Sequence, residues 1–148
     1  MARSIADDEK SPYAKYETFK KAYDNVNFFT ESGNLIAAFV LCFSILEDRL
    51  CAAVVICSRA TKRKINEDNV SKMPFKQRID LLSEMQAIDV DLYDRLLSAA
   101  YLRNELTHKM MWRLDVFHTS HIKSFRSLIN ELQKIQRVHE KTLKMIAL

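Results

Sequence analysis

The chain has 148 residues, the length of one ordinary domain, and is long enough to bury a sizeable core. A hydrophobic fraction of 48% excludes an intrinsically disordered protein, and one glycine with two prolines excludes folds that need many tight turns between strands. The formal net charge of +4 is compatible with a nucleic-acid partner, although many unrelated proteins share it. We therefore predict an all-α protein.

In the first half of the chain, the residue pattern predicts a polar tail followed by two helices. Residues 1–10 have no apolar run, so we expect a disordered tail and no signal peptide. Ser11-Pro12 pairs a helix-capping serine with a proline at the first helical position, and Glu31 to Asn34 ends that helix and caps the next. From Leu35 to Cys57, apolar residues recur in steps of three and four, which predicts a central helix.

The second half predicts one long break and three further helices. Residues 59–74 are interpreted as a basic helix end followed by a loop, and the apolar spacing over 75–85 predicts a short helix. Asp89 is the expected N-cap of the next helix. Asp115 or Thr119 begins a long last helix with a heptad-like apolar pattern.

Together these elements predict one compact antiparallel bundle of four to five helices over residues 11–148. The longest apolar stretch, residues 35–46, is too short to span a membrane. Three cysteines, Cys42, Cys51 and Cys57, lie in one predicted helix, and their odd number predicts reduced, buried thiols in a cytoplasmic protein.

The candidate chemistry lies in the stretch Arg103-Asn104-Glu105-Leu106-Thr107-His108. Arginine binds phosphate and imidazole transfers protons near neutral pH, which are the two functions that a metal-free ribonuclease needs. Asn104 and His108 share one helix face, whereas Arg103 lies about 140° around an ideal helix from His108. By spacing alone, a solvent-exposed helix face with an incidental histidine remains an alternative.

The segment Leu102 to His108 resembles the signature of HEPN domains, in which an arginine and a polar residue precede a histidine near the end of a helix. The stretch Phe39 to Leu50 resembles the central early helix of such domains, and Phe75 to Leu82 resembles the segment that leads into the motif helix. The resemblance covers roughly residues 35–148, with 13–29 as an additional helix.

The resemblance implies a metal-independent endoribonuclease of a toxin–antitoxin, abortive-infection or related defence system. It implies a homodimer in which two facing motifs form one composite active site, with RNA as substrate, an antitoxin protein as a partner and no cofactor. His108 would then be a general acid or base toward the 2′-hydroxyl or the leaving oxygen. Arg103 would stabilise the phosphate charge of the transition state, and Asn104 would position His108 or the phosphate.

One position departs from the family pattern. Some HEPN toxins have a tyrosine two residues after the histidine, which a nucleotidyltransferase antitoxin modifies, and this chain has Met110 there. Control by that modification is therefore not expected. Other family members are binding modules without catalysis.

Two further groups of charged residues are candidates for supporting roles. Glu47, in the middle of the second helix, is expected to orient Arg103 or His108; the alternatives are a solvated face or an ion pair with Arg49 or another helix. A basic cluster is a candidate for contact with RNA phosphates, the alternative being cations that stabilise a helix C-terminus. That cluster consists of Arg59, Lys62, Arg63 and Lys64.

His118 and His121 are spaced as the start of a metal site, but no cysteine or carboxylate cluster completes it, so we predict no metal. Two other functions remain open for the chain as a whole. One is a helical interaction module without catalysis, and the other is a small basic nucleic-acid-binding protein.

Overall fold

The computed structural model describes residues 12–109 and 113–147, and this part of the chain contains six α-helices, one 3₁₀ turn and no strand. The all-α prediction is confirmed. The long helices are α2 (Pro12–Glu31), α3 (Leu35–Ala60), α5 (Phe75–Glu84), α6 (Val90–Lys109) and α7 (Thr119–Ile146). The short elements are α4 (Glu67–Val70) and the 3₁₀ turn η1 (Leu114–Val116).

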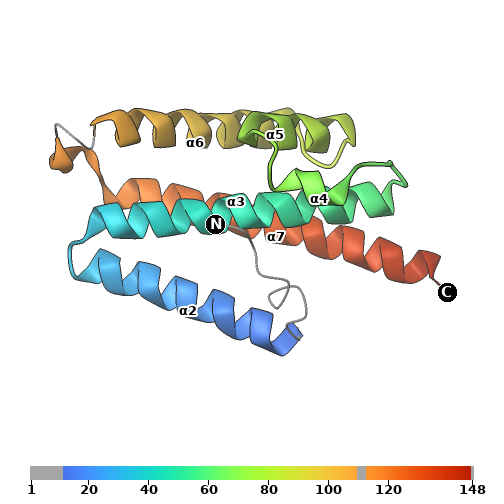
Figure 1. Ribbon diagram of the computed structural model, residues 1–148, viewed down its shortest axis with the longest axis horizontal. Coiled ribbons are helices and arrows are strands. Elements are labelled where there is room, and N and C mark those ends of the chain that lie inside the picture. The colour runs from blue at the N-terminus through green and yellow to red at the C-terminus, as the bar shows by residue number, and fades with distance from the viewer. Residues whose placement is uncertain (1–11, 110–112, 148) are drawn as a thin grey trace.

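Helices α3 and α7 lie side by side at the centre of the bundle, with α2 on one side and α5 and α6 on the other (Figure 1). The helices α2, α3, α6 and α7 alternate in direction along the chain, so α3 and α7 run parallel to each other (Figure 1). Their contacts advance together along both helices, from Phe39 against His121 to Arg49 against Gln136.

The core is centred on the contact between α3 and α7. Phe39 and Phe43 on α3 lie against the ring of Phe125 on α7, at centroid distances of 5.0 and 5.3 Å. Ile122, Phe125, Ile129 and Leu132 of the predicted heptad-like pattern are all buried. The same pattern does not stay buried to the helix end, because Ile146 is 53% exposed. Helix α7 therefore packs on the bundle over its first half and extends beyond it.

The predicted helix caps at Asn34 and Asp89 are confirmed. The Asn34 side-chain oxygen accepts a hydrogen bond from the backbone N–H of Ala37 at 3.2 Å, and Asp89 accepts one from Leu92 at 2.8 Å. These side chains satisfy backbone donors that have no partner within the helix. The two long helices that carry the candidate residues therefore begin where local sequence fixes them.

Helices α2, α3 and α5 end in the same way. A residue just after each helix adopts a left-handed conformation, with φ of 82° at Gly33, 57° at Lys62 and 56° at Gln86. The next backbone N–H then bonds back into the last turn, as Ala87 does to the carbonyl of Leu82 at 2.9 Å. This is the Schellman type of helix termination.

The structure corrects the expected loop over residues 59–74 and decides between the two expected starts of the last helix. Residues 59–74 are not a continuous loop, because Asn66 accepts a bond from the Asp68 N–H at 3.2 Å and starts the single turn of α4. The last helix begins at Thr119, whereas Asp115 lies in η1. The expected tail, the Ser11 cap and Met110 lie outside the described residues.

Two of the three thiols of α3 are buried as expected, and the expectation that they are reduced stays a prediction. None of the three cysteines forms a disulfide bond in the described part of the chain; Cys42 and Cys57 are buried and Cys51 is half-buried. Burial raises the pKa of both the Cys42 and the Cys57 thiol to about 11.

None of the described helices has the length and apolar character that a membrane span requires.

Candidate functional site

The candidate motif occupies the last two turns of α6, which remains a regular α-helix through Lys109. Asn104 and His108 are exposed on one face of the helix, while Arg103 is half-buried on the side toward α3. In the described part of the chain, no hydrogen bond or ion pair joins Arg103 to His108. The helix therefore presents the arginine and the histidine in different directions, as ideal helical geometry predicts.

Arg103 is held by packing on an aromatic ring. Its guanidinium carbon lies 4.9 Å from the ring centroid of Phe43, and that ring stacks in turn on Phe75 of α5 at 5.4 Å. The Nε atom of Arg103 is buried and has no hydrogen-bond partner among the described residues. A cation–π contact positions the guanidinium group without neutralising its charge, so Arg103 stays available to an anion.

The other polar residues of the motif have local partners. Glu105 forms an ion pair with Lys109 at 2.7 Å, and the hydrogen bond from that ammonium group lowers the pKa of the Glu105 carboxyl. The Thr107 hydroxyl donates a hydrogen bond to the backbone carbonyl of Arg103 at 2.7 Å. Glu105 therefore does not compensate the charge of Arg103, and the side chains left for chemistry are Arg103, Asn104 and His108.

Glu47 lies one helical turn after Phe43 and forms an ion pair with Arg78 of α5, at 3.8 Å. This geometry corresponds to the alternative of an ion pair with another helix. No hydrogen bond or ion pair links Glu47 to Arg103 or His108 in the described residues. A role for Glu47 in orienting the motif stays a prediction.

Sequence reasoning missed Arg78, which is only 5% exposed. Its guanidinium group donates hydrogen bonds to the backbone carbonyls of Val70, Ser71 and Met73, at 2.8 to 3.0 Å. Arg78 thereby fixes the chain between α4 and α5, immediately before the start of α5. The available signal was a basic residue between apolar residues on the buried face of a helix.

The basic cluster lies at the end of α3, at the opposite end of the bundle from the C-terminus of α6 (Figure 1). Two of its four cations are paired: Arg59 binds Glu67 through two bonds of 2.7 and 2.8 Å, and Arg63 binds Glu84 at 2.7 Å. Lys62 and Lys64 are exposed. The fold does not bring this cluster to the candidate motif of the same chain.

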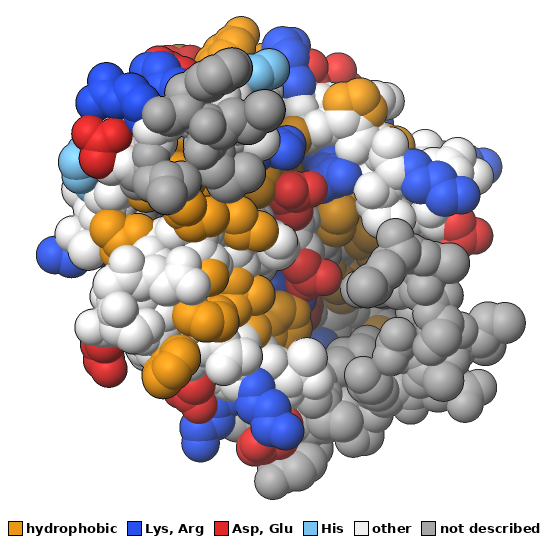
Figure 2. Space-filling view, turned by 60° about the vertical axis from the view of Figure 1, so that its left-hand side comes forward, with side chains coloured by type: hydrophobic (Ala, Val, Ile, Leu, Met, Phe, Trp, Pro, Cys, Tyr) orange, Lys and Arg blue, Asp and Glu red, His pale blue; other side chains and the backbone are white. Residues whose placement is uncertain are grey.

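In the described part of the face shown in Figure 2, basic and acidic side chains are mixed. Figure 2 brings the left-hand side of Figure 1 forward and shows hydrophobic side chains across this face, with basic and acidic side chains interspersed among them. The cations on this face are therefore close to carboxylates, and a large uniform electrostatic attraction for nucleic acid is not a feature of this view.

His118 and His121 lie together at the start of α7, with ring centroids 5.4 Å apart. The His121 Nδ1 atom accepts a hydrogen bond from the backbone N–H of His118 at 3.2 Å. Burial, followed by the charge of His118, lowers the pKa of His121. Among the described residues there is no group of three or more histidine, cysteine or carboxylate side chains that could hold a metal ion.

Two clefts adjoin α6. The first has a volume of about 360 Å³ and lies between α6 and the start of α5. Its lining includes Phe75, Lys76, Leu97, Tyr101, Arg103 and Asn104. We call it the α5–α6 groove. Two residues of the candidate motif therefore contribute to a concave surface.

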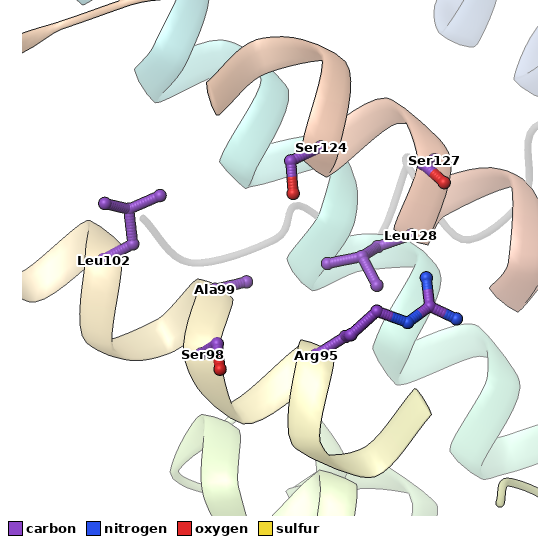
Figure 3. Close-up of a pocket in the computed structure, with 7 residues that line it drawn as sticks. All are labelled: Arg95, Ser98, Ala99, Leu102, Ser124, Ser127 and Leu128. Carbon is purple, nitrogen blue, oxygen red and sulfur yellow. The ribbon is translucent and has the colours of Figure 1, made fainter. Parts of the chain in front are cut away.

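The second cleft, of about 250 Å³, lies between α6 and α7. Small side chains such as Ser98, Ala99 and Ser124 line it, and Arg95 reaches across it from α6 (Figure 3). Arg95 is already bound to Asp91 at 2.9 Å and to Glu131 at 2.6 Å. The charge in this cleft is therefore compensated within the chain.

No protein-family model matches the chain, and no curated protein or solved structure is significantly similar to it.

Proposed function

We propose that this protein is a metal-independent endoribonuclease of the HEPN type. The observation that carries the proposal is the state of Arg103, whose guanidinium group has no acidic partner among the described residues and is held on Phe43 beside a groove. Asn104 and His108 are exposed farther along the same helix. Arginine fixed next to an open surface suits a phosphate, and an exposed histidine suits proton transfer to or from a bound substrate.

The proposed reaction uses the 2′-hydroxyl of RNA as the nucleophile. The 2′-oxygen attacks the adjacent phosphorus atom, the bond from phosphorus to the 5′-oxygen breaks, and a 2′,3′-cyclic phosphate and a 5′-hydroxyl result. His108 takes the proton from the 2′-hydroxyl or gives one to the leaving 5′-oxygen. Arg103 stabilises the negative charge that develops on the phosphate oxygens. DNA lacks the nucleophile and is not cleaved.

The active form is proposed to be a homodimer. Arg103 and His108 of one copy lie about 140° apart around a regular helix, which disfavours joint contact with one phosphate. A second copy facing the first would supply a histidine from the opposite side. Asn104, one turn before His108 on the same face, would position the phosphate or the second copy's histidine.

The proposed biological role is that of a cytoplasmic toxin or anti-phage defence effector restrained by an antitoxin protein. Because position 110 is methionine, restraint through modification of a tyrosine two residues after the histidine is not expected. An adjacent gene whose product binds this protein and protects cells that express it supports the role. Absence of any growth effect on expression would contradict it.

The decisive experiment is cleavage of single-stranded RNA in the presence of EDTA. Wild-type protein is expected to cleave, His108→Ala to lose about 100-fold or more in rate, and His118→Ser, a change at another exposed histidine, to keep wild-type activity. RNA with a single 2′-deoxy substitution at the cleavage site is expected to resist. Equal rates for wild type and His108→Ala would remove His108 from the mechanism.

The same assay separates the two other functions. An interaction module gives no cleavage and binds its partner even when Arg103→Ala is introduced. A basic nucleic-acid binder shows salt-sensitive affinity for RNA and DNA alike that depends on the basic cluster. The ion pairs of Arg59 and Arg63 within the chain make this last function the least supported.

A further inference from the structure

We propose that the α5–α6 groove binds one nucleotide of single-stranded RNA, with the base on the ring of Tyr101 and the phosphate near Arg103 and Lys76. This inference deepens the proposed function by naming how substrate is held beside the motif, and it rests on that function. It concerns binding rather than the chemical step, so the two can be tested separately.

The position of the groove relative to His108 supports this assignment. Tyr101, Asn104 and His108 are separated by three and four residues and therefore follow one stripe along α6. Tyr101 and Asn104 line the groove, and His108 continues the stripe about 10 Å beyond Tyr101 along the helix axis. A nucleotide in the groove therefore lies on the stripe of α6 that carries the motif.

Tyr101 has the properties of a stacking platform. Its side chain is 66% exposed, and it lies on the helix that carries the candidate motif. The other aromatic side chain of the groove, Phe75, is occupied by stacking on Phe43. Unstacked bases of single-stranded RNA bind to exposed aromatic rings of this kind, and such stacking tolerates any base.

Two basic side chains, one of them paired with a carboxylate, and one amide complete the groove. Arg103 is half-buried and forms no side-chain hydrogen bond or ion pair in the described part of the chain; its Nε atom is buried, so a ligand would contact the exposed part of the guanidinium group. The Lys76 side chain is 60% exposed and its charge is paired with Asp80 at 2.9 Å, so it contributes a hydrogen-bond donor at the rim of the groove rather than an uncompensated charge. The Asn104 amide can donate and accept, as the edge of a base requires.

The size of the groove suits one nucleotide. Small-molecule sites commonly have volumes of about 300 to 1,000 Å³, and the α5–α6 groove, at about 360 Å³, lies at the lower end. A groove with one free ring and cations beside it therefore fits a single base with its phosphate.

The test measures RNA binding in a His108→Ala background, so that cleavage does not interfere. A fluorescently labelled single-stranded RNA of about ten nucleotides is titrated at fixed salt. Tyr101→Ala is expected to weaken binding by about fivefold or more, and Tyr101→Phe, which keeps the ring, to change it less than about twofold. Phe28→Ala removes an aromatic side chain of similar exposure, 63%, from α2 and is expected to leave binding unchanged.

The outcomes separate the groove from the catalytic proposal. If Tyr101→Ala binds as tightly as its parent, or if Phe28→Ala weakens binding equally, the groove assignment is overturned whether or not the protein cleaves RNA. If wild-type protein shows no cleavage but binding depends on the Tyr101 ring, the ribonuclease proposal fails and the groove stands. Because Tyr101 is exposed, thermal unfolding of all variants is expected to match the parent.

Discussion

Two arginines near the candidate groove show how burial and partners decide what a residue does. Arg78 is almost fully buried and donates to three backbone carbonyls, so its hydrogen-bonding capacity is used within the fold. Arg103 lies on the Phe43 ring and has no carboxylate or carbonyl partner in the described residues. The first arginine is structural, whereas the second has its charge available.

This contrast predicts different losses of stability for the same substitution. Arg78→Met removes a buried guanidinium group, its hydrogen bonds to three backbone carbonyls and its ion pair with Glu47, and is expected to lower the free energy of unfolding by about 3 kcal/mol. Arg103→Met keeps an apolar side chain on Phe43 and loses one cation–π contact, so the expected cost is below about 1 kcal/mol. Urea unfolding at one protein concentration measures both values. Equal losses would contradict the assigned roles.

At the level of helices, the sequence predicts what is determined locally. The starts of α3 and α6 follow from Asn34 and Asp89, because a capping bond involves only residues three positions apart. Helix α4 was missed because four residues are too few to show helical periodicity. The partner of Glu47 and the contact of Arg103 with Phe43 depend on how helices distant in sequence pack, which spacing does not encode.

The left-handed residues that end helices α2 and α5 predict measurable changes in the free energy of unfolding. Gln86 adopts a left-handed conformation that favours glycine, so Gln86→Gly is expected to raise the free energy of unfolding by about 0.5 to 1 kcal/mol. Gly33 has φ of 82°, and a Cβ added there would meet no atom within 4 Å, so Gly33→Ala is expected to cost about 1 kcal/mol through backbone conformation alone.

Gln86→Ala is the matched control, because alanine keeps the left-handed strain and shortens only an exposed side chain. Its stability in urea is expected to stay within about 0.5 kcal/mol of wild type. If Gln86→Gly is no more stable than Gln86→Ala, the conformation of residue 86 does not limit stability.

For the molecule as a whole, the bundle holds the arginine and the histidine of the candidate motif apart within one copy. The parallel central pair α3 and α7 leaves α6 on one side, with the end of α6 near the start of α7 (Figure 1). The arginine of the motif faces α3 and the histidine faces solvent. The proposed ribonuclease therefore needs a second copy to bring a histidine to the phosphate that Arg103 binds.

Mixing two inactive variants tests this requirement directly. Arg103→Ala and His108→Ala homodimers are each expected to be inactive, but random reassociation of equal amounts converts half of the dimers to heterodimers that contain one intact arginine and one intact histidine. If these two side chains act on one phosphate from different copies, the mixture recovers activity, up to about half of wild type when one such pair suffices.

The control replaces the Arg103→Ala protein with the double variant Arg103→Ala/His108→Ala, whose heterodimers with His108→Ala contain no histidine at position 108 and must stay inactive. Recovery in the first mixture alone establishes a site shared between copies, because a site within one chain lacks either arginine or histidine in every molecule present. Activity equal to the sum of the two separate variants, with heterodimers demonstrated by native mass spectrometry, would place the reaction within a single chain and contradict the homodimeric site.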